Sequence, residues 1–458
     1  MNKIASDNWP ESWKTLEHGI RSGRYTDPEF ARLEHERLWS NTWQAAARLD
    51  EIPETGDYTV YDIGHHSIMV VRVDENTVKA YHNACPHRGT ALAEDAGSFE
   101  KCRIICPFHG WRWDLAGKNQ YVLERQQFRD GKLKDEDVAL KEVPVEIWAG
   151  FVFIYPGKNP SSFADFIAPV KQLTEDLAIG DMHHYWWKSV EVPANWKVAV
   201  EAFLEGYHVP ATHPQLEKEG ADFIFGDDVA TPPPHYSHLD HLYETFEHGH
   251  GRFLGGEKTP MAGHVRVEGD PVDLMADRLN LLVEGMDAMV LAEDVALVRS
   301  LKGKPIPEGS SLGAEYMKAL YETAAKQQRP MPKPEPQVLA QWGGEIFIFP
   351  NLMILPQAGN TMIYRVRPNG FDPNSCIFEI YSTKTLPAAE KPKRAEVQKM
   401  TDVHDPAQFL QIPRQDFANI PRIQKGLHTQ GAKQIWLADY YEKIILNMHQ
   451  EIDRYIKD

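Results

Sequence analysis

The amino-terminal part of the chain changes from a helical to a strand-like pattern of hydrophobic residues. Between residues 12 and 39, apolar side chains such as Phe30 and Trp39 recur among charged residues at roughly helical spacing. From about residue 43, short alternating or apolar runs such as 67–71 are separated by turn residues, a pattern typical of strands. We therefore predict a helical segment followed by a small all-β domain over residues 40–157, inserted early in the chain.

The rest of the chain, residues 158–458, mixes both kinds of pattern. Helical spacing predicts helices over 161–178, 197–208, 271–296, 311–327 and 433–456. Apolar or alternating runs predict strands over 184–192, 344–355, 361–368 and 375–384. Strands framed by helices in this way indicate an α+β fold, here a larger domain of helices and antiparallel sheet. We expect residues 1–39 to pack on this larger domain.

Composition and charge exclude several classes of protein. The chain has 458 residues and a net charge of −17, which argues against nucleic acid as a partner because phosphate binding needs clustered basic residues. No apolar run approaches the roughly 18 residues that span a membrane, and no apolar signal core begins the chain. Only four cysteines occur, which suits a reducing compartment. We expect a cytoplasmic protein without a membrane partner.

Two short loops carry candidate metal-binding chemistry. They read Cys85-Pro-His87-Arg-Gly and Cys106-Pro-Phe-His109-Gly-Trp, with eighteen residues between His87 and Cys106. Two thiols and two imidazoles can bind tetrahedral zinc, but zinc fingers usually pair Cys with Cys and His with His. Here each loop is mixed, which favours a Rieske [2Fe-2S] cluster with thiolates on one iron and imidazoles on the other.

A second candidate site lies in residues 195–214. On a continuous helix, Glu201, Glu205 and His208 would share one face, because they are spaced at i, i+4 and i+7. His213 would point elsewhere on an ideal helix, but Pro210 should distort the helix and re-aim it. Two imidazoles and one carboxylate form the facial triad of non-haem Fe(II). Read alone, the pattern also suits a solvated helix face.

Over most of its length the chain resembles the alpha (large) subunit of Rieske non-haem iron oxygenases, the aromatic-ring-hydroxylating dioxygenase family. The two loops resemble the Rieske domain, and residues 195–213 resemble the iron-site signature of this family. Residues 414–427 begin with Gln-Asp and end with Gln-Lys-Gly-Leu, like the segment that carries the third iron ligand. The implied ligands are Cys85, His87, Cys106 and His109 for the cluster, and His208, His213 and Asp416 for mononuclear iron.

Two of these assignments leave alternatives. Asp416 competes with Asp402 and Asp405 for the role of third ligand, and could instead cap a helix. Glu205 occupies the place where many family members have Asp. In the family this acid links an iron-ligand histidine to the Rieske histidine of a neighbouring subunit. The corresponding Rieske histidine in this sequence is His109.

The resemblance implies a terminal oxygenase. Electrons would come from a ferredoxin or an NAD(P)H-dependent reductase, because no Gly-x-Gly-x-x-Gly motif indicates a nucleotide site in this chain. O2 would be activated at mononuclear Fe(II), and we expect hydroxylation, in particular dihydroxylation, of an aromatic substrate. The alternative is a monooxygenase or demethylase acting on a substrate such as a quaternary amine. The family also implies a homotrimer, with or without small beta subunits.

Two alternatives from other classes use the same Cys/His loops. An electron-transfer Rieske protein would need only the first constellation, and a structural zinc protein would bind a colourless ion there.

Further cysteine and histidine residues invite other interpretations. We expect Cys102, close to the loops, to be a buried structural thiol. Five histidines without an accompanying cysteine are better explained by a solvated or pocket-lining loop than by a zinc site. They are His235, His238, His241, His248 and His250.

Overall fold

The computed structural model describes residues 9–216, 241–255, 269–339, 344–390 and 392–457. The chain divides into two compact units. The smaller comprises residues 32–166 with 393–396, and the larger comprises 1–31, 167–392 and 397–458. The α+β prediction is confirmed, with an all-β part early in the chain and a larger part of helices and sheet. No helix in the described ranges is both long and apolar enough to cross a membrane.

The smaller unit consists of three antiparallel sheets. Their strand orders are β11-β6-β5-β4-β7, β12-β13-β3 and β10-β9-β8. The strands are β3 (Gln44–Arg48), β4 (Asp57–Ile63), β5 (His66–Arg72), β6 (Val78–His82), β7 (Ala96–Ser98), β8 (Arg103–Ile105), β9 (Arg112–Asp114), β10 (Asn119–Tyr121), β11 (Glu142–Val143), β12 (Val145–Trp148) and β13 (Phe151–Ile154). Burial alternates along β4, whereas β5 and β13 are buried along most of their length, as expected for strands covered on both faces.

The larger unit is built around an eight-stranded sheet of order β15-β16-β17-β18-β19-β20-β14-β21. Its strands are β14 (Met182–Val192), β15 (Leu242–Thr245), β16 (Gly251–Leu254), β17 (Gly344–Ile348), β18 (Leu352–Pro356), β19 (Asn360–Pro368), β20 (Cys376–Thr385) and β21 (Gln398–Met400). All neighbours pair antiparallel except β14 and β21. A small separate sheet joins β1 (Thr15–Leu16), β2 (Gly19–Arg21) and β22 (Gln434–Trp436).

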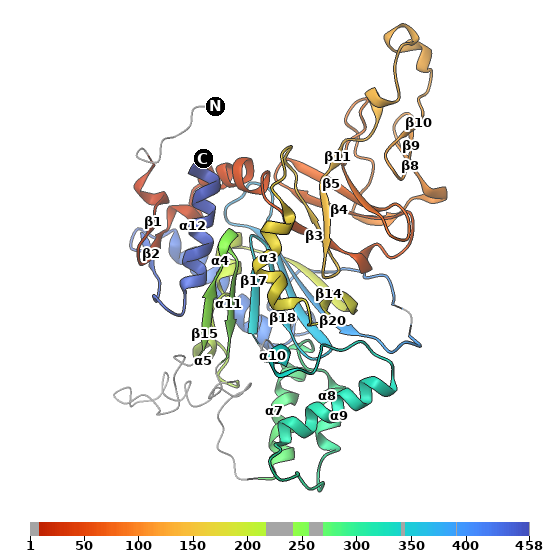
Figure 1. Ribbon diagram of the computed structural model, residues 1–458. Coiled ribbons are helices and arrows are strands. Elements are labelled where there is room, and N and C mark those ends of the chain that lie inside the picture. Colours follow the sequence, from red (N-terminus) through yellow and green to blue (C-terminus); the bar gives the residue numbers. More distant parts are fainter. Residues whose placement is uncertain (1–8, 217–240, 256–268, 340–343, 391, 458) are drawn as a thin grey trace. The chain divides into compact units, whose positions relative to one another are not determined.

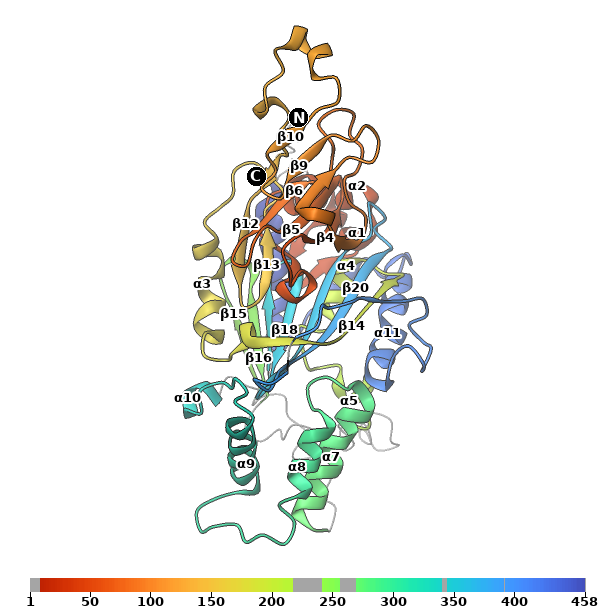
Figure 2. The same ribbon diagram turned by 90° about the vertical axis from the view of Figure 1, so that its right-hand side faces the viewer.

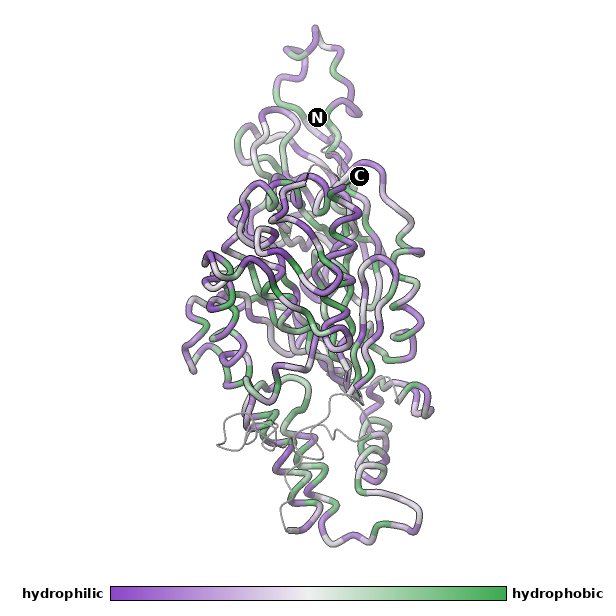
Figure 3. Tube along the Cα trace, turned by 90° about the vertical axis from the view of Figure 1, so that its left-hand side faces the viewer, coloured by the Kyte–Doolittle hydropathy of each residue, from purple (hydrophilic) through white to green (hydrophobic). Residues whose placement is uncertain are grey.

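The α-helices in the described ranges are α1 (Gly23–Thr26), α2 (Pro28–Leu33), α3 (Phe163–Thr174), α4 (Trp196–Glu201), α5 (Val209–Thr212), α7 (Pro271–Met286), α8 (Ala292–Arg299), α9 (Leu312–Lys326), α10 (Pro336–Leu339), α11 (Gln411–Leu427) and α12 (Lys443–Lys457). In the larger unit, α4 packs on β19 and β20, α11 packs on α4 and α7, and α12 packs on β15 and β16. Figures 1 and 2 show α7, α8 and α9 grouped at one end of the large sheet. Hydrophobic stretches run through the sheet in Figure 3, whereas α7 to α9 alternate between hydrophilic and hydrophobic residues.

Several predicted elements are divided in the structure. The predicted helix over 271–296 is two helices, α7 and α8. The first ends because the backbone of Asp287, which follows α7, adopts the left-handed conformation. The predicted strand over 344–355 is the pair β17 and β18, separated at Phe349-Pro350 because proline has no N–H for a sheet ladder. The predicted helix over 433–456 begins as strand β22 and is helical only from Lys443.

Candidate functional site

The two Cys/His loops of the smaller unit share one backbone hydrogen-bonding pattern. The N–H of Cys85 donates to the carbonyl of Thr90 (2.8 Å), and the N–H of Cys106 donates to the carbonyl of Trp111 (2.9 Å). Each loop therefore closes back on its own cysteine. Two loops built alike present one thiol and one imidazole each.

A glycine completes each loop. The N–H of Gly89 donates to the Cys85 carbonyl (2.9 Å), and that of Gly110 to the Cys106 carbonyl (3.0 Å). Both glycines adopt positive φ angles, +78° and +68°, which residues with a Cβ rarely adopt. No atom would crowd a Cβ at either position, so backbone conformation rather than space requires glycine here.

The four donor atoms of the loops form a thiol pair and an imidazole pair. The Nδ1 atoms of His87 and His109 are 3.2 Å apart. Burial, reinforced by the neighbouring Cys106 thiol, raises the pKa of Cys85 to about 11. Although all four residues lie in the described part of the chain, no three of their donor atoms lie within 4.8 Å of one another. A single tetrahedral zinc needs its ligands around one point, whereas a two-iron cluster takes thiolates and imidazoles on different irons, so the arrangement fits the cluster.

Aromatic residues surround the imidazole pair. Trp111 stacks on His87 with ring centroids 4.8 Å apart, and Phe128 meets the same imidazole edge-on at 5.7 Å. Phe108, which contacts the His109 ring at 4.1 Å, is 57% exposed. The two cysteines are almost fully buried in the hydrophobic core beneath. The thiol side is thus enclosed, while the histidine side carries an exposed aromatic residue.

In the larger unit, the predicted helix over 197–208 is wrong. Asn195 accepts a hydrogen bond from the N–H of Lys197 as the N-cap of α4, but α4 already ends at Glu201. A new single turn, α5, begins after His208 with Pro210 in its first positions. Proline favours the first positions of a helix, which suits the place of Pro210 in α5, whereas α4 ends well before it. His208 and His213 flank this turn, so both rings face one side.

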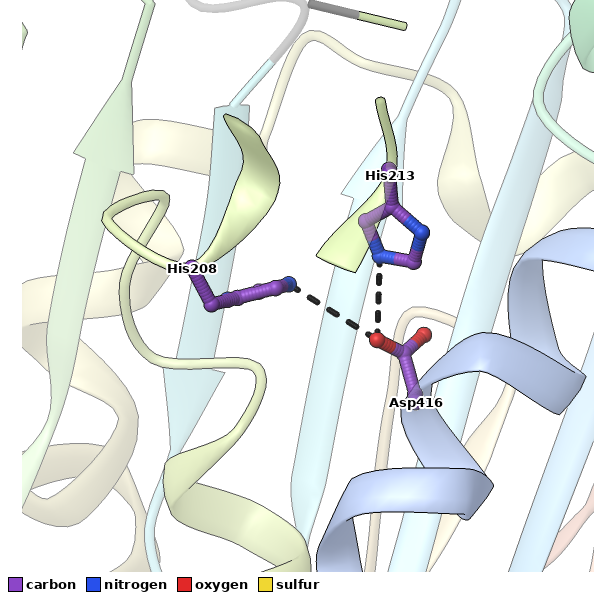
Figure 4. Close-up of side chains that lie close together, drawn as sticks. All are labelled: His208, His213 and Asp416. Carbon is purple, nitrogen blue, oxygen red and sulfur yellow. Dashed lines mark ion pairs between the residues drawn. The ribbon is translucent and has the colours of Figure 1, made fainter. Parts of the chain in front are cut away.

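These two histidines meet Asp416, which is buried in α11 (Figure 4). The Nε2 atom of His213 lies 3.0 Å from Asp416 Oδ1, and the Nε2 atom of His208 lies 3.7 Å from the same oxygen. One ligand atom from each residue lies within 4.8 Å of the other two. Two imidazoles and one carboxylate with this spacing fit a mononuclear Fe(II) ion and leave further coordination positions open.

Glu205 holds His208 through two hydrogen bonds. Its Oε2 accepts from the His208 backbone N–H (2.9 Å), and its Oε1 lies 2.8 Å from His208 Nδ1. Burial alone would lower the pKa of His208, but the carboxylates of Glu205 and Asp416 outweigh it and raise the pKa to about 9. Because Nδ1 faces Glu205, Nε2 is left to face Asp416. A carboxylate that orients a ligand histidine in this way is typical of metal sites.

Two glutamines that the sequence reasoning missed orient the other histidine. Gln415 Oε1 lies 2.9 Å from His213 Nδ1 and also accepts from Gln215 Nε2 (2.8 Å). Gln415 Nε2 returns a hydrogen bond to Gln215 Oε1 (3.1 Å). In the sequence, these glutamines are marked only by their closeness to the proposed ligands, as Gln415 directly precedes Asp416.

Glu201 does not belong to this site, which corrects the predicted shared face. Its carboxyl accepts from the Tyr25 hydroxyl (2.9 Å) and lies 2.7 Å from His449 Nε2. Burial raises the pKa of Glu201 to about 8. The helix end after Glu201 thus separates it from Glu205 and places it in a buried network beside α12.

The other candidate acids make local contacts. Asp402 accepts from the N–H of His404, and Asp405 accepts from the N–H of Ala407, each at 2.8 Å. These are turn-capping contacts two residues away. The geometry therefore favours Asp416 over both alternatives.

The remaining expectations have mixed outcomes. Cys102 is exposed, so the prediction of a buried thiol is wrong. His235 and His238 lie outside the described residues. His250 is fully buried and its Nδ1 accepts from the N–H of Phe349 (3.0 Å), so a solvated loop does not describe it. His241 is also buried.

Comparison with protein families agrees with both sites. Residues 42–139 match the Rieske [2Fe-2S] domain. Residues 179–278 and 304–458 match the ring hydroxylating alpha subunit (catalytic domain). Together these matches cover the loops in the smaller unit and the histidine and aspartate residues in the larger one.

Individual relatives were also found. The glycine betaine monooxygenase oxygenase subunit of Chromohalobacter salexigens is 28% identical over 222 residues, 47% of this chain and 48% of the relative. The carnitine monooxygenase oxygenase subunit of Escherichia coli is 30% identical over 192 residues, 42% and 50% of the two chains. The chain thus spans about half the length of the curated relatives it matches.

Solved structures share the fold at low sequence identity. A quaternary ammonium Rieske monooxygenase in complex with gamma-butyrobetaine has a TM-score of 0.63 and 16% identity, covering 98% of this chain and 99% of the other. Naphthalene 1,2-dioxygenase from Rhodococcus sp. bound to indole has a TM-score of 0.63 and 19% identity, covering 96% and 94%. Structures with very different ligands are therefore equally similar in fold.

Proposed function

Because this chain belongs to the ring-hydroxylating alpha-subunit family, we propose that it is the terminal oxygenase component of a Rieske oxygenase system. The single observation that carries this proposal is the presence in one chain of both the paired Cys/His loops and the group of His208, His213 and Asp416. An electron carrier would need only the loops, and a structural zinc protein would need neither the second group nor separated thiol and imidazole pairs.

We propose the following residues as the ligands of the two cofactors, and the distances described above support them. The cluster ligands are Cys85, His87, Cys106 and His109, and the iron ligands are His208, His213 and Asp416. When bound, the cluster supplies electrons singly and the iron makes O2 reactive towards organic molecules.

The chain's own residues orient the proposed iron ligands. Glu205 and Gln415 fix which nitrogen of His208 and His213 faces the ion, because each occupies the other ring nitrogen. His213 and Asp416 are buried, 3% and 5% exposed, whereas the His208 side chain is 25% exposed. Glu205 is also the proposed route for electrons from His109 of the partner subunit, which requires the proposed homotrimer.

The proposed substrate is a quaternary amine. This proposal is supported by the curated relatives that are named glycine betaine and carnitine monooxygenase oxygenase subunits. The aromatic substrate that the sequence favoured receives less support, although naphthalene 1,2-dioxygenase has an equally similar fold. In the proposed net reaction, one oxygen atom of O2 enters a C–H bond beside the quaternary nitrogen and the other leaves as water, with two electrons and two protons consumed. The C–N bond of the hydroxylated carbon then breaks: its electron pair stays on the nitrogen, which becomes a tertiary amine, the carbon leaves as an aldehyde, and the hydroxyl proton is released.

The proposed partners are a ferredoxin or an NAD(P)H-dependent reductase that docks near the cluster. The half-buried His109 and the exposed Phe108 beside it offer a place for electron entry or exit at the histidine side of the loops.

Metal analysis followed by turnover tests the proposal. Anaerobically purified protein should contain about three irons and two acid-labile sulfides per chain, with the EPR spectrum of a histidine-ligated cluster after reduction. With a reductase, O2 uptake should be coupled to aldehyde release from quaternary amines and not to oxidation of naphthalene or benzoate. Zinc without sulfide would reject the oxygenase, and coupled oxidation of only the aromatic compounds would reject the substrate.

A further inference from the structure

A buried acid beside the proposed iron site has no role in the arrangement described above. Glu345 lies in β17 and is 4% exposed. Its Oε1 atom is buried, and among the residues that the structure describes none donates a hydrogen bond to it. Buried carboxyl groups are almost always paired, so this one requires an explanation.

The register of the sheet shows which way Glu345 faces. Glu345 pairs directly with Phe253 on β16, and Phe253 pairs with Tyr243 on β15. Directly opposed residues of antiparallel strands project from the same face, so the three side chains form a row across this edge of the sheet. Strands β15 and β17 are labelled in Figure 1 and β16 in Figure 2.

This row lies against the turn that carries the proposed iron ligands. The N–H of Gly206 donates to the Tyr243 hydroxyl (3.3 Å). A Cβ atom at Gly206 would lie 3.8 Å from the Phe253 ring. Gly206 directly follows Glu205, so the row that contains Glu345 contacts the segment between Glu205 and His208.

The electrostatic surroundings of Glu345 are negative. Burial, followed by the charges of Glu205 and Asp416, raises the pKa of Glu345 well above its usual value. Burial, followed by the charges of Asp416 and Glu345, likewise raises the pKa of Tyr364 on β19. Within the described ranges, the charged groups that act on Glu345 are therefore both acidic, and it lacks a basic side chain as counter-ion.

We propose that the Glu345 carboxylate and the Phe253 ring bind the quaternary ammonium group of the substrate beside the iron ligands. This inference rests on the proposed quaternary-amine substrate. A quaternary ammonium group has no N–H and is recognised by negative charge and by aromatic faces, and this row offers both. A bound cation supplies the counter-ion that the protein itself lacks at this carboxyl group. An uncharged aromatic substrate would offer Glu345 neither a charge nor a hydrogen bond. Burial of an unpartnered carboxylate beside apolar groups costs free energy.

Matched ligands and a conservative variant test the role of Glu345. The iron-loaded full-length protein would be titrated with choline and glycine betaine, and with their isosteres 3,3-dimethyl-1-butanol and 3,3-dimethylbutanoate, in which carbon replaces the charged nitrogen. Binding would be measured calorimetrically for wild type and for Glu345→Gln. The control is Glu244→Gln, since Glu244 pairs with Arg252 on the opposite face of the same strands.

We expect wild type and Glu244→Gln to bind the ammonium compounds about 10- to 100-fold more tightly than the isosteres. Glu345→Gln should lose this preference while binding the isosteres as before, with unchanged iron content and thermal stability. An ammonium preference that persists in Glu345→Gln overturns the role of Glu345 and leaves the proposed function intact. If wild type shows no preference for ammonium compounds, the quaternary-amine substrate is rejected together with the inference.

Discussion

Replacing Glu205 by alanine would remove both hydrogen bonds that hold His208 in place. The carboxylate accepts from the His208 backbone N–H at 2.9 Å and lies 2.8 Å from Nδ1, and Glu205 is only 8% exposed. Water would therefore replace it poorly, and His208 would be free to rotate away from Asp416. Loss of such an orienting partner typically weakens metal binding about 10- to 100-fold, which corresponds to about 1.4–2.8 kcal/mol of binding free energy.

The assay is iron retention against a chelator, with acid-labile sulfide as the internal reference for the cluster. In Glu205→Ala the ratio of iron to sulfide should fall from about 3:2 towards 2:2 at chelator concentrations that leave wild type intact. Glu205→Gln should lie between the two, because its amide oxygen can still accept one of the hydrogen bonds.

Asp402→Ala serves as the matched control, because it removes an acid of the same region that caps only a turn. Its iron content should equal that of wild type. Wild-type iron affinity in Glu205→Ala would refute the orienting role of Glu205, and iron loss in Asp402→Ala would refute the choice of Asp416 as the third ligand.

Two further predictions concern buried charges of the larger unit. Because burial raises the pKa of Glu201 from 4.5 to about 8, the folded state binds a proton more tightly than the unfolded state, so stability should fall as pH rises from about 4.5 to 8. In Glu201→Gln, the free energy of unfolding, measured with urea, should fall with pH by up to about 1 kcal/mol per pH unit less than in wild type. The same pH dependence in both proteins would contradict the raised pKa of Glu201. Burial alone would raise the pKa of Glu379, but Arg365 and Arg367 outweigh it and lower the pKa from 4.5 to about 2. This carboxylate therefore contributes its full stabilisation above about pH 4.5, and the contribution is lost as pH falls from 4.5 through 2. Glu379→Gln leaves the two arginines without their shared partner and should reduce the free energy of unfolding by about 3–5 kcal/mol at pH 7, whereas a loss below about 1 kcal/mol would mean that water replaces the carboxylate.

The loops of the smaller unit were predictable because their chemistry is local. Cysteine, histidine and glycine lie within five residues of one another in each loop, so sequence spacing already determines which donors are neighbours. Their hydrogen bonds also run within each loop, from Cys85 to Thr90 and from Cys106 to Trp111. The exposure of Cys102 was not predictable, because it depends on how a turn packs against other strands.

The residue types of the proposed iron site could be predicted from the sequence, but their geometry could not. A continuous helix was expected to align Glu201, Glu205 and His208, but the chain leaves the helix at Glu201 and starts a new turn before Pro210. Spacing identifies residues that would share a face of a regular helix, but it does not show where long-range packing ends that helix.

The sequence by itself determined the donor atoms, the mixed Cys/His loops and the α+β class, since these depend on residue type and short spacing. The tertiary structure decided that Asp416 rather than Asp402 or Asp405 faces the two histidines, and that Gln415 orients one of them. Through the register of β15, β16 and β17 it also aligned Glu345 with Phe253 and Tyr243, which lie beside Gly206. The physical reason is that a shift of one residue in strand register reverses the face to which a side chain points, and register is set by contacts between segments far apart in the sequence.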